Sequence, residues 1–340
     1  MKKALVLILT LALLLTTLAS LVSCGNDATP EDTTDATAGS TATDDPAIRI
    51  GFLSGSTGLG LSKLIADNEQ SGNDFYIRFN SPVEIMSAFA NGSIDLAALP
   101  TNAFPNYANQ MKGNREIQMI ALNTLGVLYL LTDDGTTVSP ADLSSLSGKT
   151  VYVPEQAPKL ILQHILQKSG VENVTLDMTY DLETLPAAAQ TDSNVHYILF
   201  PEPKVTVLLN TQGNKTYSIA LDLTEAWANV EDDQLVQGCM FASKSFIEEH
   251  PAAIAGFLAD YERSINFMKD PANLDAAAQY AVNAGIFPKL PIAKQAIPRC
   301  NLTFITGDDM ANTANAFFTA LGIAEQPISA FYGITDDNLD

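Results

Sequence analysis

The amino-acid sequence predicts an α/β protein of two lobes, each a mixed, mostly parallel sheet flanked by helices. Short apolar runs that end in polar or proline-containing loops alternate with segments of helical periodicity, as in parallel sheets covered on both faces. Two such series follow one another, separated by the break Asp133-Asp134-Gly135, and the chain then becomes helical. Its 340 residues are enough for about two domains, so length also favours two lobes.

The first 46 residues have the composition of a targeting segment followed by a linker. Two lysines precede the apolar run Ala4–Leu15, which predicts a secretory signal peptide over residues 1–24 because the run is too short to be a convincing membrane span. Residues 25–46 are almost entirely Thr, Ala, Asp, Gly, Ser and Pro. Such a composition buries too little apolar surface to fold, so we expect a disordered tether.

The end of the signal segment, Leu21–Cys24, resembles the lipobox of bacterial lipoproteins. In that motif the cysteine is acylated and becomes the mature N-terminus, which implies lipid attachment at Cys24. A plain signal peptide that ends in small residues is the alternative. The lipobox predicts a protein held at the extracytoplasmic face of the cell membrane by its lipid alone.

The strongest local pattern of the folded body lies between Ser81 and Asn102. Ser81 can cap a helix whose first position suits Pro82, and Glu84 completes a capping box. Helical spacing predicts one buried apolar face, formed by Val83, Met86, Phe89 and Ala90.

The same unit continues into a strand and a polar loop. Asn91-Gly92 supplies a left-handed stop, since Gly carries no Cβ, and the apolar run Ile94–Leu99 predicts a strand covered on both faces. Thr101 and Asn102 then either cap the next helix or meet a ligand, and the two roles are compatible.

The rest of the chain follows the same scheme from Ile48 onward. Apolar runs predict strands at 48–53, 75–79, 117–122, 126–131, 149–153, 195–200, 218–223 and 235–241. Helical periodicity predicts further helices after Gly60 and at 159–167, 251–268, 274–284 and 310–321. With crossings near 131–134 and 235–239, one lobe comprises residues 47–133 and 238–340, and the other comprises 134–237.

Ligands of open α/β sheets bind beyond the carboxyl ends of the strands. The polar loops at those ends supply the expected ligand contacts, which are Ser54, Ser56, Thr57, Gly58, Thr101, Asn102, Thr124, Gln156 and Glu202. Gln156 and Glu202 have a plainer alternative as solvated loop residues, and Trp227 is expected to pack in the core.

Composition and motifs exclude several classes of protein. The net charge of −21 disfavours nucleic acid and anionic membrane surfaces as partners. The loop Gly55–Gly60 lacks the Lys of a Walker A motif and the Rossmann spacing of glycines, and neither a Gly-x-Ser-x-Gly elbow nor an HExxH motif is present. Glu248-Glu249-His250 could resemble metal ligands, but two acidic residues at a helix start are more simply explained by their favourable interaction with the helix dipole. We therefore expect no catalytic residue, metal or cofactor.

Cys239 and Cys300 are the two cysteines of the folded body. An exported protein allows a disulfide between them, but Cys239 lies in a strand pattern and can equally be a buried thiol. The sequence leaves both alternatives open.

The order and spacing of these motifs resemble the solute-binding proteins of ABC importers, in the group of nitrate, sulfonate or taurine, and thiamine-pyrimidine binders. The matching segments are Gly55–Gly60, Ser81–Asn102, Leu146–Pro154, Pro201–Pro203, and Asp222-Leu223 with Trp227. The resemblance covers most of residues 48–320. It implies a periplasmic-binding-protein-like fold of type II, a monomer whose lobes close over a small solute and dock on a membrane permease.

The charge of the expected ligand loops favours one kind of solute. They carry carboxylates at Glu155 and Glu202 but neither Arg nor Lys. A desolvated carboxylate repels an anion and accepts hydrogen bonds from ring amines, which favours a neutral or weakly basic pyrimidine over a sulfonate or nitrate. The helix start at Ser56–Gly58 is the counterargument, because its amide groups can bind an anion.

Two other functions stay open at the level of sequence. Relatives of the thiamine-precursor proteins include enzymes of pyrimidine biosynthesis with this fold, although the lipobox and tether stand against that reading. The other rival is a surface sensor or adhesin domain, which would bind no small molecule. The favoured function is a lipid-anchored extracytoplasmic receptor that passes a solute to an ABC importer.

Overall fold

The computed structural model describes residues 46–334. The expected signal peptide, its lipid-attachment residue Cys24 and the tether up to residue 45 lie outside the described residues. None of the helices within residues 46–334 combines the length and the apolar character that crossing a membrane requires.

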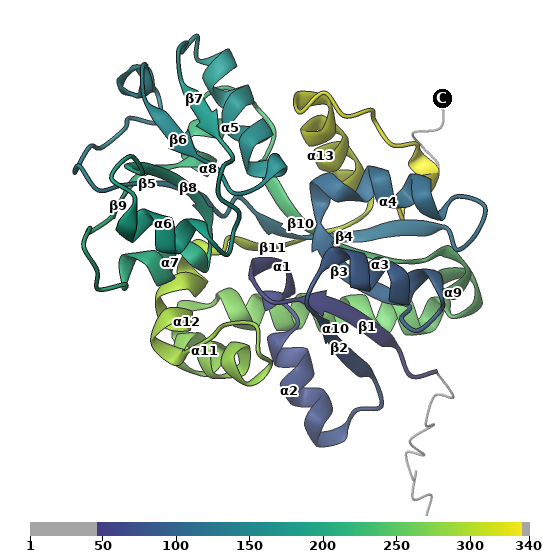
Figure 1. The fold of residues 1–340 in the computed structure, drawn as a ribbon. Coiled ribbons are helices and arrows are strands. Elements are labelled where there is room, and N and C mark those ends of the chain that lie inside the picture. The colour runs from purple at the N-terminus through teal and green to yellow at the C-terminus, as the bar shows by residue number, and fades with distance from the viewer. Residues whose placement is uncertain (1–45, 335–340) are drawn as a thin grey trace, which may run out of the picture. The chain divides into compact units, whose positions relative to one another are not determined.

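The first sheet has six strands in the order β11-β4-β10-β3-β1-β2 (Figure 1). They are β1 (Arg49–Leu53), β2 (Phe75–Phe79), β3 (Leu96–Pro100), β4 (Ile117–Leu125), β10 (Val236–Ser243) and β11 (Leu302–Ile305). β1 is parallel to β2 and β3, whereas β10 is antiparallel to both β3 and β4. Strands β1 to β4 therefore run in one direction and end at one edge, and β10 and β11 run against them.

The second sheet has five strands in the order β7-β6-β8-β5-β9. They are β5 (Leu128–Thr132), β6 (Thr150–Tyr152), β7 (Thr175–Asp177), β8 (Tyr197–Pro201) and β9 (Ser218–Asp222). β6 is parallel to β7 and β8, and β5 is antiparallel to β8 and β9. Only β5 opposes the common direction, so the expected α/β fold with two mixed, mostly parallel sheets is confirmed.

The chain passes from the first sheet to the second between β4 and β5, at Gly126-Val127. We expected this crossing at 131–134, which would have left β5 in the first lobe, but β5 pairs with β8 and β9. The difference arises because Asn123 and Thr124, taken as a break between two apolar runs, are buried within β4. The return crossing precedes β10, close to the expected position.

Helices cover both faces of each sheet (Figure 1). They are α1 (Ser56–Leu59), α2 (Ser62–Ser71), α3 (Pro82–Ala90), α4 (Phe104–Met111), α5 (Gln156–Lys168), α6 (Leu185–Thr191), α7 (Lys204–Leu209), α8 (Leu223–Trp227), α9 (Lys244–Glu249), α10 (Pro251–Lys269), α11 (Leu274–Asn283), α12 (Leu290–Ala296) and α13 (Gly307–Ala320). Short 3₁₀ turns include η1 (Thr101–Ala103), η2 (Ser144–Leu146), η3 (Pro271–Asn273), η4 (Ile297–Arg299) and η5 (Ile328–Ala330). The expected helices near 251–268, 274–284 and 310–321 correspond to α10, α11 and α13.

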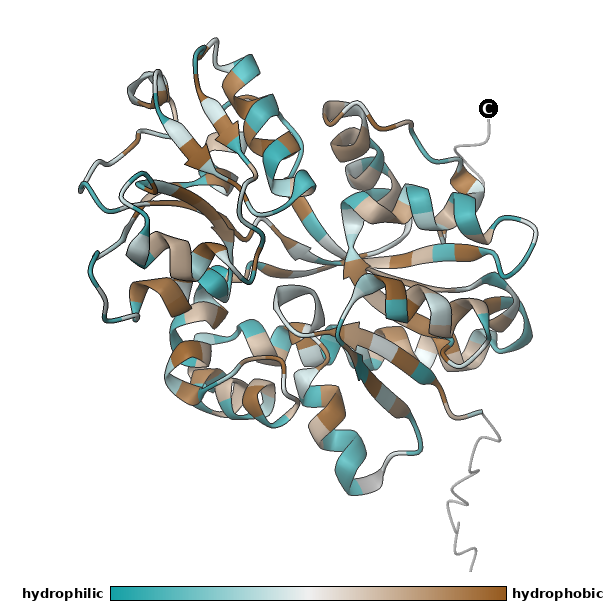
Figure 2. Ribbon diagram, in the orientation of Figure 1, coloured by the Kyte–Doolittle hydropathy of each residue, from teal (hydrophilic) through white to brown (hydrophobic). Residues whose placement is uncertain are grey.

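Three apolar clusters form the core, and the strands that carry them are largely apolar in Figure 2. One cluster lies between the first sheet and helices α2, α9, α10, α11 and α12, and another lies between the second sheet and helices α6 and α7. The third runs across the remaining faces of both sheets. Trp227 is buried within it, with ring centroids 5.9 Å from Phe317 of α13 and 5.2 Å from His164 of α5, which confirms that it packs in the core.

Helix α3 begins as its sequence predicts but buries a different face. The Ser81 hydroxyl accepts the Glu84 N–H at 3.3 Å, while Glu84 in return accepts the N–H of Asn80 at 3.0 Å, one residue before the cap. The buried residues are Ile85, Met86, Ala88 and Phe89. Val83 is 74% exposed, and Ala90 is also exposed. The predicted face is therefore right for Met86 and Phe89 and wrong for Val83 and Ala90, because the helix turns Ile85 and Ala88 toward the core instead.

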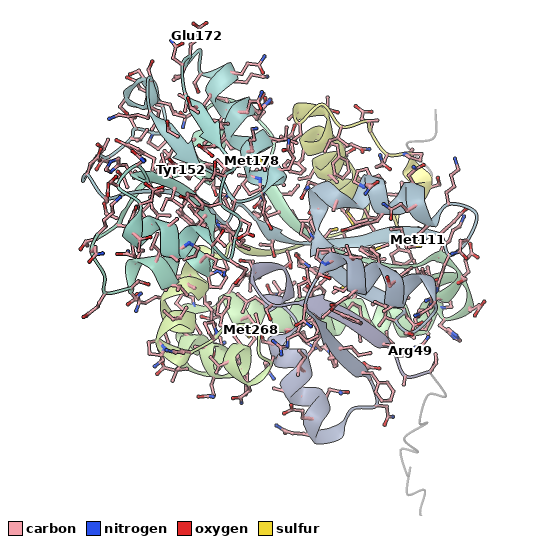
Figure 3. All side chains as sticks on the ribbon, viewed as in Figure 1. Arg49, Met111, Tyr152, Glu172, Met178 and Met268 are labelled. Carbon is pink, nitrogen blue, oxygen red and sulfur yellow. The ribbon has the colours of Figure 1, made fainter. Side chains whose placement is uncertain are left out.

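Buried Asp95 anchors the opposite edge of the first sheet, where the strands begin. Arg49, at the start of β1 (Figure 3), donates to it through Nε at 2.8 Å, and Arg115 donates through a terminal nitrogen at 3.0 Å. The Arg115 guanidinium also donates to the carbonyl of Ile94 at 2.6 Å. These two arginines are thus committed to structure and lie at the strand edge away from the loops that follow β1 and β3.

Candidate functional site

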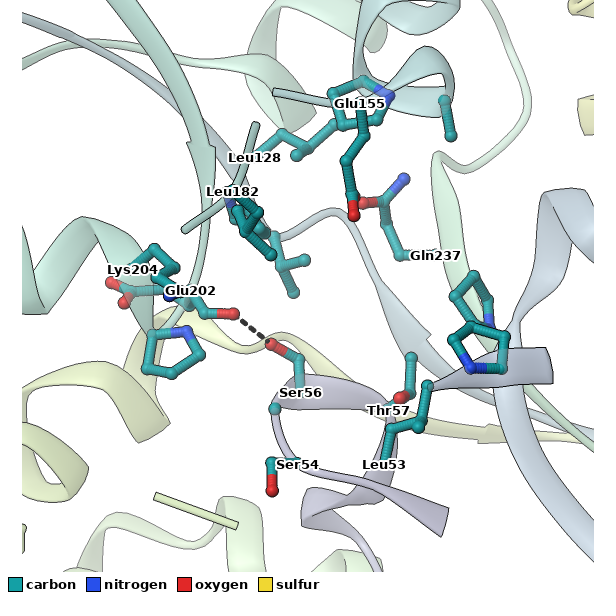
Figure 4. Close-up of a pocket in the computed structure, with 18 of the residues that line it drawn as sticks. Leu53, Ser54, Ser56, Thr57, Leu128, Glu155, Leu182, Glu202, Lys204 and Gln237 are labelled. Carbon is teal, nitrogen blue, oxygen red and sulfur yellow. Dashed lines mark hydrogen bonds between the residues drawn. The ribbon is translucent and has the colours of Figure 1, made fainter. Parts of the chain in front are cut away.

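A cavity of about 700 Å³ lies where the carboxyl ends of β1, β2 and β3 face those of β6 and β8 (Figure 4). The first sheet and the helices that follow it contribute Leu53, Ser54, Gly55, Ser56, Thr57, Phe79, Asn80, Pro82, Pro100, Asn102, Gln237, Ile286 and Pro288. The second sheet contributes Val127, Leu128, Glu155, Ala157, Pro158, Leu182, Glu183, Pro201, Glu202, Pro203, Lys204 and Val207. A cavity of this size accommodates a small organic molecule.

Five of the nine predicted ligand contacts line this cavity. They are Ser54, Ser56, Thr57, Asn102 and Glu202. The four others, Gly58, Thr101, Thr124 and Gln156, lie outside its lining. The loops after β1, β3 and β8 thus contribute to the lining of the cavity, whereas Thr124 lies within β4 and does not reach it.

The tight turn into α1 depends on two glycines. Gly55 adopts a φ of 112°, a conformation that residues with a Cβ rarely adopt. A Cβ on Gly58 would lie only 2.4 Å from the carbonyl oxygen of Leu53. Gly58 therefore has a steric role in bringing α1 close to the end of β1, which leaves Ser56 and Thr57 at the cavity.

A buried polar layer supports α1 from β4. The Thr124 hydroxyl lies 2.9 Å from Asn123 Oδ1 and 3.3 Å from the carbonyl oxygen of Ser56. Asn123 donates through Nδ2 to the carbonyl of Thr57 at 3.3 Å. Thr124 thus positions the residues that line the cavity and is itself fully buried.

Thr101 and Gln156 have other surroundings. Thr101 is fully buried beneath the cavity, and its hydroxyl faces the thiol of Cys239, whose pKa burial raises to about 12. Its side chain makes no capping bond to η1 or α4. Gln156 is exposed at the first position of α5, beside the lining residues Glu155 and Ala157.

Glu202 follows β8, and its carboxylate accepts hydrogen bonds from three groups of the protein. Its carboxylate accepts the N–H of Thr206 at 3.1 Å, the hydroxyl of the same residue at 3.0 Å, and Nε of Arg299 at 2.5 Å. The Glu202 side chain is fully buried, and this burial raises its pKa against the opposing effect of Arg299. The loop is therefore fixed from both sides of the cavity, because Arg299 belongs to η4, just before β11.

A direct hydrogen bond joins the two sides of the cavity. The Ser56 hydroxyl, from α1, donates to the carbonyl oxygen of Glu202 at 2.9 Å (Figure 4). Ser56 is buried, so this bond is shielded from water. Asn210, which caps the C-terminus of α7, adds a further contact beside the Glu202–Arg299 pair by donating to Gln295 of α12 at 3.0 Å. The described conformation thus has the two sides in contact around the cavity.

Several lining residues were not foreseen. Asn80 directly follows β2, so the strand-end rule could have found it. Gln237 lies at the start of β10, and because β10 runs against β1 to β4 its first residues reach the same edge. Ile286 and Pro288 come from the segment between α11 and α12, whose approach to the cavity has no sequence signal.

The cysteines and the acidic groups form no further centre within residues 46–334. Cys239 and Cys300 are separate buried thiols, and the Cys300 thiol donates to the carbonyl of Ala296 at 3.2 Å. In the same range, no three His, Cys, Asp or Glu side chains gather as a metal site would require.

Solved structures of binding proteins share this arrangement of two sheets around a cavity. An ABC transporter protein of Parabacteroides distasonis has 15% identity and a TM-score of 0.66, over 86% of this chain and 98% of that one. The periplasmic aliphatic sulphonate binding protein SsuA of Escherichia coli has 17% identity and a TM-score of 0.63, over 84% and 91%. The periplasmic nitrate-binding protein NrtA of Synechocystis PCC 6803 has 12% identity and a TM-score of 0.51, over 70% and 66%. No family model and no curated protein sequence matches the chain.

These similarities, all at low identity, establish the fold. The chain has the two-lobed fold of periplasmic binding proteins, with the cavity between the strand ends of the two sheets. Among the neighbours reported above, the particular solutes named are an aliphatic sulphonate and nitrate, each for the protein concerned.

Proposed function

We propose that the protein is an extracytoplasmic solute receptor that captures a small molecule in this cavity and delivers it to the permease of an ABC importer. The observation that carries the proposal is the cavity itself, which is lined by residues from two separate sheets. The transport proteins among its structural neighbours support the same function.

Capture depends on movement between two lobes. One lobe is the first sheet with residues 47–126 and 236–334, and the other is the second sheet with residues 127–235; these limits follow the sheet pairing rather than our original boundary. Ligand that contacts both sides stabilises the closed state, since it gains its full set of contacts only there. The Ser56–Glu202 bond forms part of that closed contact.

A screen for ligands with a structural readout tests the receptor function. The folded body is heated with nitrate, sulfonates, pyrimidines and amino-acid-like compounds, and compounds that raise the melting temperature are then followed by small-angle X-ray scattering. A receptor gains stability by RT ln(1 + [L]/Kd) and becomes more compact. Absence of any thermal shift would favour a sensor or adhesin domain. Consumption of a hit would favour the pyrimidine-biosynthesis enzyme.

Membrane attachment through Cys24 is a separate part of the proposal. Two acyl chains hold a protein stably at a membrane, whereas a polar tether alone does not. We expect Cys24→Ala to shift the full-length protein from the membrane fraction to the soluble fraction, and Cys24→Ser to behave alike. An alanine variant that still partitions with the detergent phase would contradict attachment at this residue.

A further inference from the structure

Most of the charged side chains that line the cavity are paired, and Arg78, which does not itself line it, donates to the hydroxyl of the lining residue Ser54 at 3.3 Å. Four lining residues carry charge, namely Glu155, Glu183, Glu202 and Lys204. Glu202 is neutralised by Arg299, whose Nε lies 2.5 Å from its carboxylate. Lys204 donates to Glu183 at 3.1 Å. Among the described residues, Glu155 is the charged lining residue without such a partner.

Glu155 presents its carboxylate to the cavity. It precedes α5 without capping it, and its side chain points into the open space between the two sides (Figure 4). Among residues 46–334, no hydrogen-bond donor or cation contacts this carboxylate. Glu155 is exposed at the mouth of the cavity, and partial desolvation by the nearby protein raises the pKa of its carboxyl, with no neighbouring charge contributing. The carboxylate therefore has unused capacity to accept hydrogen bonds.

Apolar groups dominate the rest of the wall. Leu128, Leu182, Val207 and Ile286 line the cavity, together with Phe79 and prolines from both sides. The uncharged polar groups come from the first side and include Ser54, Thr57, Asn80, Asn102 and Gln237. A ligand that fills this space meets a largely apolar surface, a neutral polar edge and one carboxylate.

On the basis of the proposed receptor function, we propose that the ligand has an apolar body and a basic nitrogen whose N–H groups are donated to the Glu155 carboxylate. An amine, an amidine or a protonated aminopyrimidine has this chemistry. A charged donor on a carboxylate makes the stronger, shorter kind of hydrogen bond, and a site lined by apolar groups strengthens it further.

The same arrangement disfavours a sulfonate or nitrate. An anion needs a compensating cation or several free donors. Arg299 is bound to buried Glu202, Lys204 is paired with exposed Glu183, and Arg78 contacts the Ser54 hydroxyl. An anion would therefore depend mainly on the neutral polar edge of the cavity. An anion would also share the cavity with the Glu155 carboxylate, and like charges in a partly desolvated site repel. The inference therefore separates this cavity from those of the sulphonate and nitrate binders with the same fold.

A matched set of probes tests the charge of the ligand. Benzylamine, benzyl alcohol and phenylmethanesulfonate share one apolar body and differ in the head group. 4-Aminopyrimidine, which has two ring nitrogens and an amino group, is the heterocyclic probe and is measured at a pH where it is protonated. Their dissociation constants are measured by calorimetry at low salt on the wild type, Glu155→Gln and the control Glu172→Gln. Glu155→Gln keeps the shape of the side chain and removes its charge. Because Glu155 makes no capping bond, we expect this variant to melt within a few degrees of the wild type.

We expect benzylamine and 4-aminopyrimidine to bind more tightly than the alcohol, and the sulfonate to bind least. Glu155→Gln should weaken the amines about 10- to 100-fold, as for loss of a hydrogen bond to a charged group, and should leave benzyl alcohol unchanged. Glu172→Gln should change all four dissociation constants less than about threefold, since Glu172 is exposed and does not line the cavity.

Two results would overturn the inference. One is tighter binding of the sulfonate than of the amine, and the other is amine binding that Glu155→Gln leaves intact. Failure of all four probes would also overturn it. The broader solute screen then separates the two proposals: hits confined to anions would reject the basic ligand and keep the receptor, whereas no hit of any class would reject both.

Discussion

The two sides of the cavity differ in what they contribute. The first side offers hydroxyl and amide groups, on residues such as Ser56, Asn80 and Gln237, and no charged side chain lines the cavity from it within the described residues. The second side supplies all four charged lining residues, from Glu155 to Lys204. The neutral side can shape and orient a ligand, whereas the charged side decides which ligand charge is tolerated.

The difference also shows that position at a strand end does not determine function. Both sides follow the same scheme of strand, loop and helix, so both present loops to one crevice. On the neutral side the loops after β1 and β3 are held by backbone geometry and buried hydroxyls. On the charged side the loop after β8 is held by an ion pair between Glu202 and Arg299. Substitutions on the two sides should therefore lower the free energy of unfolding by different amounts.

The largest effect is expected from Arg299→Ala on the charged side. It leaves the fully buried Glu202 carboxylate without its cation, and breaking a buried pair costs about 3 kcal/mol of unfolding free energy. Urea unfolding measures this loss. Adding Glu202→Gln to Arg299→Ala should recover part of it, because the unpaired charge is removed. A loss below about 1 kcal/mol for the single variant would mean that the pair does not hold the loop.

On the neutral side, Gly58→Ala should destabilise the protein by about 1–3 kcal/mol. The new methyl group would lie 2.4 Å from the backbone oxygen of Leu53, so α1 must shift. The matched control is Gly256→Ala in α10, where an added Cβ meets nothing within 4 Å. Thermal unfolding of the two variants should move in opposite directions, since Ala favours a helix over Gly by about 1 kcal/mol. Equal shifts in melting temperature for the two variants would contradict the expected clash at Gly58.

Ser56→Ala tests the bond that joins the two sides. It removes the donor to the Glu202 carbonyl and should cost about 1 kcal/mol, as for a typical hydrogen bond. Ser54→Ala is the control, because the Ser54 hydroxyl bonds to the carbonyl of Gly285 at 2.9 Å in an exposed setting. Small-angle scattering without ligand should show a larger radius of gyration for Ser56→Ala only. An unchanged radius would indicate that other contacts hold the sides together.

The smallest effect is expected from Lys204→Ala, which breaks the pair with Glu183 at the edge of the charged side. The Glu183 side chain of this pair is exposed. The pair therefore contributes about 0.2–1 kcal/mol to the free energy of unfolding, and this contribution decreases with salt. Chemical unfolding at low and high salt measures the difference. A loss as large as that of Arg299→Ala would mean that burial does not distinguish the two pairs.

The sequence predicted the fold through its apolar periodicity. The strand from Ile94 to Leu99 and the cap at Ser81 appear in the structure nearly as expected, because both depend on neighbouring residues only. The predicted crossing was placed after β5 instead of after β4, because Asn123 and Thr124 resemble a loop in sequence. In the structure they are buried in β4, and their side chains donate hydrogen bonds to backbone carbonyls of α1. Local patterns do not reveal polar groups that are buried to support another segment.

The candidate site was predictable in its loops and less so in its chemistry. Ser54, Ser56 and Thr57 follow a strand directly and line the cavity. Glu202 follows one as well, but its carboxylate is taken up by Arg299, a residue 97 positions later. Glu155 becomes the available carboxylate by elimination, once each charged neighbour has been paired. Such pairing is set by tertiary contacts, so the sequence named Glu202 as a ligand contact and Glu155 only as a second carboxylate of these loops.

The central place of β10 has a consequence for the order of folding. This strand lies between β3 and β4 and pairs with both, although the whole second sheet separates it from them in the chain. Until Val236–Ser243 is available, β3 and β4 have no partner on their shared side, and the first sheet cannot close. Such distant pairing makes folding slow. A chain that ends before β10 can therefore complete the second sheet, but its first sheet stays divided between β3 and β4.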